Sequence, residues 1–426
     1  MNYLFCLILF TTYMIYMLTI MKKSWIFTCF INFLVASLMG LLLRLMYVAP
    51  IEGINFQFLM HGHSHVAMLG WVYLMLYSLI IHFFVPTEAQ QKPIYNRLFW
   101  ITQISVVGMM IDFPAQGYAF ASILFSTLHI FCSYYFVHLI WKEAKPSTFP
   151  EKRMLRTALF FMVFSTLGVW CLGPAVGLLG KASAFYQIAI QFFLHFQFNG
   201  WFLFAVLALF FKQSSIAIDE KKFRLFYNLL VTATVLTLAL PVSWSLSNPV
   251  FYWINAIGVL VQLIALILFT QLIQTQFQTF FAPLSPLEKT VYRFALGSLA
   301  LKIIIQLVVL VPELVHVSHE IRNFVVGYIH LTMLGIITGF LFGFALQNGF
   351  LSSQNKIQKW GIIIFLLGFV ATEILLFLQG TWLLLNNVSF PDYYQILFIA
   401  SIPLPLGLLS IIGSLLNDSK IKLFDP

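Results

Sequence analysis

The sequence predicts an all-α polytopic membrane protein, and three observations support this fold class. Hydrophobic residues make up 61% of the 426 residues and charged residues only 9%, a composition far from that of a soluble globular domain. Apolar runs long enough to cross a hydrocarbon core about 30 Å thick recur along the chain. A histidine-containing segment is also repeated at a nearly constant interval. Because lipid cannot satisfy open backbone groups, each apolar run is predicted to be a helix.

About twelve apolar runs supply the roughly 20 helical residues that a span requires. They lie near residues 27–48, 58–85, 97–113, 116–141, 154–179, 184–211, 223–246, 250–278, 287–311, 319–347, 358–386 and 392–416. Residues 1–24 precede this core, and two interpretations of them stay open: an extra span, or an extension upstream of the true start. Residues 417–426 form a short tail with four charged side chains.

The basic residues indicate orientation. The net charge is +9, but the lysines and arginines lie in short loops between the spans rather than in one patch, so nucleic acid is not an expected partner. Most fall on one side, whereas Arg44, Lys181 and Arg322 fall on the other. Under the positive-inside rule, both ends of the twelve-span core are expected to be cytoplasmic, with the chain in the inner (cytoplasmic) membrane.

An internal repeat carries three histidines. The segments are "HVAMLGW" from His65, "HFQFNGW" from His195 and "HLTMLGI" from His330, which share the pattern H-x4-G. The separations are 130 and 135 residues, enough for four spans each. We therefore expect one membrane domain, residues 25–416, composed of three pseudo-symmetric four-helix units near residues 25–150, 151–282 and 283–416. Each histidine then lies in the second helix of its unit, at a similar depth in the outer half of the membrane.

The histidines and glycines of this repeat suggest a binding site. Intramembrane ionisable groups point to function, and neutral imidazole is a common ligand of haem iron, copper and zinc. The motif glycine would let a neighbouring helix or a flat cofactor approach closely. His61 and His65 are spaced i,i+4 and share a helical face, whereas His63 is rotated by about 200°. Hydrogen bonding between helices remains the alternative role for each histidine.

This arrangement resembles the catalytic subunit of the haem-copper oxidase superfamily, including its nitric-oxide-reductase branch. The H-x4-G segments are also similar to those of the NnrS proteins, membrane haem proteins linked to the nitric oxide response. The resemblance covers residues 25–416 as topology, with short motifs. It implies a haem b between the second and tenth helices, held by His65, or alternatively His63, and by His330. His195 occupies the place of a ligand to a second metal, copper or iron.

Two departures from the family pattern concern its reactive site. The family has two adjacent histidines in helix seven, but Phe223 to Asn248 contain none. In helix ten the family has H-x-H, whereas this chain has Tyr328 at the first position and His330 at the second. Tyrosine ligates haem iron in some proteins. The resemblance therefore implies a degenerate oxygen-reducing site and a retained low-spin pair.

Further polar residues lie before and within the later spans. His316 and His319 are spaced i,i+3 and could ligate metal, and Arg322 could pair with haem propionates; a solvated polar loop is the alternative. His319 is eleven residues before His330, which on one continuous helix would be the same face. His61 and His319 are thus further metal candidates.

Inside the spans, Lys302, Gln306 and Glu373 indicate either a proton route or an ion pair between helices.

The sequence therefore predicts a membrane haem protein for electron transfer or for chemistry on nitric oxide or oxygen. As an oxidoreductase it would use a quinol or a redox partner subunit as electron donor. Two other classes stay open: a haem-binding sensor or assembly factor without turnover, and a transporter with a histidine-lined site. Transporters often break helices with proline at the substrate site. The three motif segments contain none.

Overall fold

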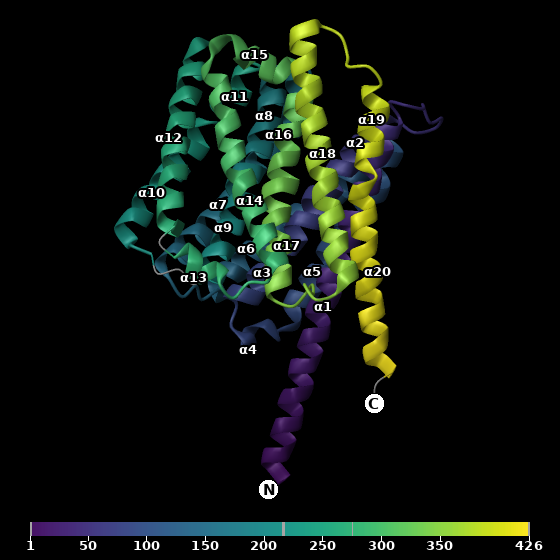
Figure 1. The fold of residues 1–426 in the computed structure, drawn as a ribbon, viewed down its shortest axis with the longest axis vertical. Coiled ribbons are helices and arrows are strands. Elements are labelled where there is room, and N and C mark those ends of the chain that lie inside the picture. The colour runs from purple at the N-terminus through teal and green to yellow at the C-terminus, as the bar shows by residue number, and fades with distance from the viewer. Residues whose placement is uncertain (1, 215–217, 275, 425–426) are drawn as a thin grey trace. The chain divides into compact units, whose positions relative to one another are not determined.

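The computed structural model describes the backbone of residues 2–214, 218–274 and 276–424, and the side chains of 23–417 apart from 215–217, 275, 316 and 318. Within these residues every regular element is a helix, as the coiled ribbons of Figure 1 show. Twelve helices in the described part of the chain are long and apolar enough to span a membrane. They are Lys23–Leu45, Phe56–Phe84, Pro93–Gln116, Phe120–Glu143, Phe149–Leu179, Ala184–Ser214, Glu220–Ser243, Pro249–Gln274, Pro286–Leu310, Arg322–Gln347, Lys356–Asn386 and Tyr393–Asn417. The predicted fold class is confirmed.

The helix that contains the first span extends toward the N-terminus. Helix α1 (Asn2–Leu45) is continuous, so residues 2–24 share its backbone with the span. Met1 and the side chains of residues 1–22 lie outside the described residues. Both interpretations of this segment therefore stay open. The tail continues the last helix, α20 (Pro403–Phe424), and its side chains after residue 417 are likewise outside the described part.

The chain divides into two compact units. Unit 1 comprises residues 1–145, 354–366 and 401–426, and unit 2 comprises residues 146–353 and 367–400. The first 145 residues of unit 1 contain the first predicted four-helix group, whereas unit 2 contains the second group and most of the third. The helices α18 (Lys356–Asn386) and α19 (Tyr393–Ser401) contribute residues to both units.

Most helices of unit 1 follow one another closely in the sequence, and α20 packs against α1 as well. After α1 they are α2 (Phe56–His65), the π-helix η1 (Val66–Tyr73), α3 (Leu74–Phe84), α4 (Thr87–Gln90), α5 (Pro93–Gln116) and α6 (Phe120–Glu143). Helices α5 and α6 pack against each other, and α1 packs against α2, η1 and α3.

Unit 2 contains the other two histidine motifs. Its helices are α7 (Phe149–Leu179), α8 (Ala184–His195), the π-helix η2 (Phe196–Phe202), α9 (Leu203–Ser214), α10 (Glu220–Leu236), α11 (Ala239–Ser243), α12 (Pro249–Gln274), α13 (Phe277–Phe281), α14 (Pro286–Gln306), the 3₁₀-helix η3 (Leu307–Leu310), α15 (Pro312–Glu320), α16 (Arg322–His330), the π-helix η4 (Leu331–Ile337) and α17 (Thr338–Gln347). Helices α10 and α12 lie side by side (Figure 1), and α7 packs against α8, η2 and α9.

Capping side chains explain where two of the motif helices begin. The Asn55 side chain accepts hydrogen bonds from the backbone N–H groups of Gln57 and Phe58, so α2 begins at Phe56. The Ser183 hydroxyl accepts from the N–H of Tyr186, and α8 begins at Ala184. Such caps satisfy N–H groups that have no partner within the helix. The predicted spans began near residues 58 and 184, so both observed starts lie within two residues of the prediction.

The repeat is visible as one structural feature that occurs three times. Each motif histidine is the last residue of an α-helix and is followed directly by a π-helix: His65 by η1, His195 by η2 and His330 by η4. A π-helix closes i→i+5 hydrogen bonds and frequently marks a functional site. The motif glycine, five residues after the histidine, therefore lies inside this wider turn. The three histidines are thus equivalent in local backbone structure as well as in sequence.

The motif glycines allow helices to pack closely. A Cβ atom on Gly70 would lie 3.1 Å from the Cβ of Asn32 on α1, and one on Gly200 would lie 2.6 Å from the Cγ of Phe161 on α7. The equivalent atom on Gly335 would lie 2.9 Å from the hydroxyl of a serine on α14. In each four-helix group the first helix is a neighbour, and at Gly70 Val106 of α5 is closer still, with its Cγ1 2.9 Å from the added atom. The first role predicted for these glycines, the approach of a neighbouring helix, is confirmed. The approach of a flat cofactor stays a prediction.

Replacing Gly200 by alanine is expected to lower the thermal unfolding midpoint of the detergent-solubilised protein. The added methyl group would overlap the Phe161 ring, and overpacking of this kind costs about 1–3 kcal/mol. Gly173 is the matched control, because it lies in α7 of the same unit and a Cβ there meets nothing within 4 Å. Alanine at position 173 should preserve or raise the midpoint. Equal destabilisation by the two substitutions would contradict the packing role.

Candidate functional site

The histidines of α2 point in two directions, as their spacing predicts. His61 and His65 both lie against Tyr118, with ring centroids 4.8 and 6.1 Å from the tyrosine ring. His65 also stacks on Phe113 of α5, at 4.1 Å between centroids. His63 faces α1 instead, where its Nδ1 lies 2.8 Å from the carbonyl oxygen of Ala36. The i,i+4 pair therefore shares one face, and His63 lies on the other.

The His65 imidazole is held in a defined protonation form. Its Nδ1 lies 2.9 Å from the carbonyl oxygen of His61, one turn earlier in α2. Because a carbonyl oxygen can only accept, Nδ1 must donate its hydrogen, and the lone pair of the neutral ring is on Nε2. Metal-ligating histidines commonly have this arrangement, in which one nitrogen donates to an oxygen and the other binds the metal.

His63 has the same protonation form but a more confined ring. A Cβ atom placed on Gly40 of α1 would lie 2.9 Å from its Cε1 and 3.7 Å from its Nε2. Its Nε2 therefore lies close to the α1 backbone. Of the two alternatives for the helix-two ligand, the His65 side chain has the geometry better suited to binding a large planar group.

His330 has a carboxylate beside it. Its Nδ1 is 3.7 Å from Oε1 of Glu373 on α18, and the Glu373 side chain is largely buried. A carboxylate next to Nδ1 orients an imidazole and leaves Nε2 as the ligand atom. Glu373 lies close to His330, and Lys302 donates to Asn199, so no ion pair joins Lys302 and Glu373 among the described residues. A proton route stays a prediction.

The segment before His330 differs from the prediction. We expected His319 to be on the same helix as His330 and three turns before it. This expectation is wrong, because α15 ends at Glu320, Ile321 is extended and α16 begins at Arg322. His319 instead stacks on Trp244, with ring centroids 4.9 Å apart. Arg322 lies exposed in the first turn of α16, and the His316 side chain is outside the described residues.

A hydrogen-bond chain crosses four helices of unit 2. The buried Lys302 of α14 donates from Nζ to Oδ1 of Asn199 at 2.7 Å, and Asn199 Nδ2 lies 3.4 Å from Nδ1 of His195. His195 Nε2 lies 2.7 Å from the carbonyl oxygen of Thr234 on α10. The Lys302 ammonium is also 5.4 Å from the ring centroid of Tyr328, within the range of a cation–π contact. Asn199 thus connects the motif histidine to a buried cation.

The geometry at His195 does not fit a metal ligand. Nε2 must donate to the Thr234 carbonyl, so Nδ1 carries the lone pair, and the Asn199 amide donates to it. Both ring nitrogens are therefore engaged with the protein. Within the part of the chain that the structure describes, no group of three or more histidine, cysteine, aspartate or glutamate side chains could hold a metal ion. Metal binding by His61 or His319 stays a prediction.

The sequence interpretation missed two residues of these sites, Asn199 and Thr234, and it missed the partner of Glu373. Asn199 is inside the second motif, "HFQFNGW", where a polar residue four positions after the histidine was a usable signal. The interaction of Glu373 with His330 joins residues far apart in the sequence, and no spacing rule relates them. The Thr234 group that matters is its backbone carbonyl, which every residue has, so its role left no signal at all.

Comparison with known proteins adds no assignment to this geometry. No protein-family model matches the chain, and no curated protein sequence matches it significantly.

Proposed function

We propose that this chain is a membrane haem protein that resembles the haem-copper oxidase and nitric oxide reductase catalytic subunits. It binds a haem b through His65 and His330, with Arg322 as the partner of the propionates. Its role is electron transfer, or chemistry on nitric oxide or oxygen, with electrons from a quinol or a redox partner subunit. Imidazole on both axial positions favours electron transfer, because a gas needs an open position on the iron.

One observation carries this proposal. Nδ1 of His65 donates to the His61 carbonyl, which leaves the Nε2 lone pair for iron in a half-buried, aromatic setting beside Phe113. The Glu373 carboxylate near Nδ1 of His330 supports the same use of Nε2 there. Haem would supply reversible one-electron chemistry when bound. The chain itself orients both imidazoles, and it places each at the start of a π-helix.

A second metal is not part of the proposal. His195 is engaged through both ring nitrogens, so its imidazole would have to lose a hydrogen bond before it could bind copper or iron. Tyr328 faces the Lys302 ammonium through its ring. The proposal therefore includes no counterpart of the reactive site of the haem-copper oxidases, in agreement with the missing helix-seven histidines.

The direct test is the absorption spectrum of protein purified from haem-replete cells, with a pyridine haemochrome assay to identify the haem. We expect the sharp α and β bands of a reduced low-spin b-type haem. A colourless preparation would refute the proposal and favour the transporter class. Turnover of a quinol under oxygen or nitric oxide, measured on coloured protein, would then distinguish an oxidoreductase from a sensor or assembly factor.

Orientation is expected to follow the positive-inside rule, with the protein in the inner membrane and both ends of the core cytoplasmic. Green fluorescent protein fused after Lys145 should fluoresce, and alkaline phosphatase fused after Lys181 should be active, because the intervening α7 crosses the membrane once. Exchanging the two reporters is the control, and it should abolish both the fluorescence and the phosphatase activity. Active phosphatase after Lys145 would reverse the topology.

A further inference from the structure

The Lys302 ammonium has more N–H donors than the protein offers acceptors for them. Its side chain is completely buried, and the ammonium donates to Asn199 Oδ1 at 2.7 Å. An ammonium group has three N–H donors. Among the described residues, no carboxylate lies within ion-pair distance of Lys302, and its other contact is the Tyr328 ring. Two donors of a charged group therefore need acceptors in the interior of unit 2.

Unsatisfied acceptors occur on the same helix and on the helix packed against it. Gln306 follows Lys302 by one turn of α14, and its Oε1 is buried without a hydrogen-bond partner among the described residues. On α12, which packs against α14, the same is true of Gln262 Oε1 and of both amide atoms of Asn255. Asn255 and Gln262 are seven residues apart, so they share one helical face. We call Asn255, Gln262 and Gln306 the amide cluster.

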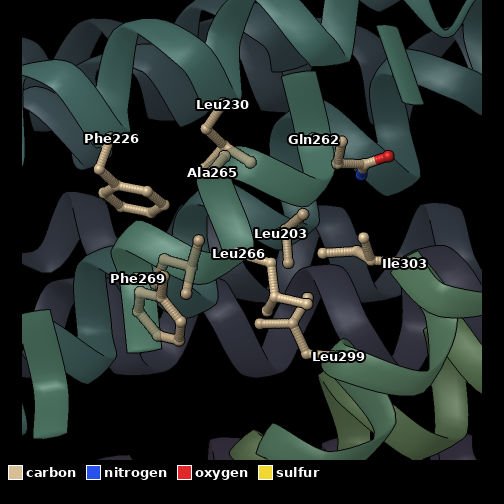
Figure 2. Close-up of a pocket in the computed structure, with 10 residues that line it drawn as sticks. Leu203, Phe226, Leu230, Gln262, Ala265, Leu266, Phe269, Leu299 and Ile303 are labelled. Atoms are coloured by element: carbon tan, nitrogen blue, oxygen red, sulfur yellow. The ribbon is translucent and has the colours of Figure 1, made fainter. Parts of the chain in front are cut away.

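A small cavity adjoins Gln262, one member of the amide cluster. It has a volume of about 20 Å³ and is bounded by side chains of α9, α10, α12 and α14. Figure 2 shows aliphatic and phenyl groups around it, with Gln262 as the amide among them. Ile303, the residue after Lys302, lines it as well. A cavity that holds one water molecule needs about 10–15 Å³ by the same measure, so this one is large enough.

We propose that unit 2 holds a cluster of internal water molecules that solvates the Lys302 ammonium, with one molecule in the Gln262 cavity. Water molecules can accept from the two remaining N–H donors of Lys302 and can donate to the amide oxygens that have no hydrogen-bond partner. The same molecules therefore satisfy both kinds of group. A small anion would accept from the ammonium. It could not satisfy Gln262 Oε1 or Gln306 Oε1, because an anion and an amide oxygen are both acceptors. The hydrated site keeps a positive charge on Lys302 beside Tyr328, without a metal ion.

Radiolytic hydroxyl labelling of the detergent-solubilised full chain tests the hydration directly and needs no bound haem. Radicals formed from a bound water molecule oxidise the side chains beside it, even where bulk water is excluded. We expect rapid oxidation of Leu203 and Ile303 at the cavity. Leu341 of α17 is the control, because it is fully buried in the same unit. Oxidation of the cavity residues no faster than that of Leu341 would overturn the proposal.

A substitution at Gln262 gives an independent test through the sign of its effect. If the amide is dry, leucine removes an unsatisfied polar group and raises the unfolding midpoint; if it binds water, leucine displaces that water and lowers the midpoint. We expect the lower midpoint. We also expect the loss to shrink when Lys302 is methionine, because there is then no ammonium to solvate. A raised midpoint for Gln262→Leu, or equal losses in both backgrounds, would count against the water cluster.

Discussion

Replacing His65 by alanine is expected to abolish the low-spin haem spectrum, and replacing His330 is expected to do the same. Each imidazole would supply one of the two nitrogens that hold the haem, so loss of either would change the haem spectrum or release the haem. The measurements are the reduced absorption spectrum and the haem content per chain. The reason for selecting His65 is the Nδ1–H···O=C bond to His61, which reserves Nε2 for the metal.

His63→Ala is the matched control, because the residue lies two positions away in the same helix and its ring faces α1. We expect that variant to retain both the spectrum and the haem content. Glu373→Gln should keep the haem but shift its midpoint potential upward, because a carboxylate near the Nδ1 of an iron-binding histidine makes it a stronger donor. A normal spectrum in either His65→Ala or His330→Ala would remove that ligand assignment.

Replacing Asn199 by leucine is expected to cost about 3 kcal/mol of stability, because it removes the protein acceptor of a fully buried ammonium. The same change removes the donor to His195 Nδ1. The measurement is the thermal unfolding midpoint in detergent. Haem content would report separately on the His65 and His330 site.

Adding Lys302→Met to this variant should recover much of the lost midpoint. The double variant replaces a charge and its partner with apolar side chains, which a protein interior tolerates better than a charge left alone. The single variant Lys302→Met completes the double-mutant cycle, which measures the interaction between Asn199 and Lys302. If the Asn199→Leu variant unfolds at the wild-type temperature, the hydrogen bond between Asn199 and Lys302 does not contribute to the stability of the protein, and the prediction is wrong.

Some site features followed from local spacing alone. The i,i+4 relation of His61 and His65, and the opposite direction of His63, are consequences of helical periodicity and were predictable. The starts at Phe56 and Ala184 were also predictable, since Asn55 and Ser183 are caps that act within one turn. Local rules failed at His319, where an extended Ile321 separates two helices and no proline or glycine marks the break.

The π-helices and the partners of the histidines could not be read from spacing. The pattern H-x4-G identified equivalent positions, but nothing in it indicates the wider turn that follows His65, His195 and His330. The assignment of His195 as a metal ligand rested on its place in the repeat. Its hydrogen bond to the Thr234 carbonyl joins residues 39 positions apart. Every residue has a backbone carbonyl, so the sequence cannot indicate which one will accept this bond.

The sequence by itself determined that the chain is a helical membrane protein with about twelve spans and three equivalent histidines, because apolar length and helical period are local properties of the chain. Only the tertiary structure decided which imidazole nitrogens remain available. For His63, His195 and His330 this depends on oxygen atoms of Ala36, Thr234 and Glu373, which lie on other helices. The His61 carbonyl that accepts from His65 lies one turn away in the same helix and is the local exception. Hydrogen bonds between helices are set by packing, so equivalent histidines in a repeat acquire different chemistry.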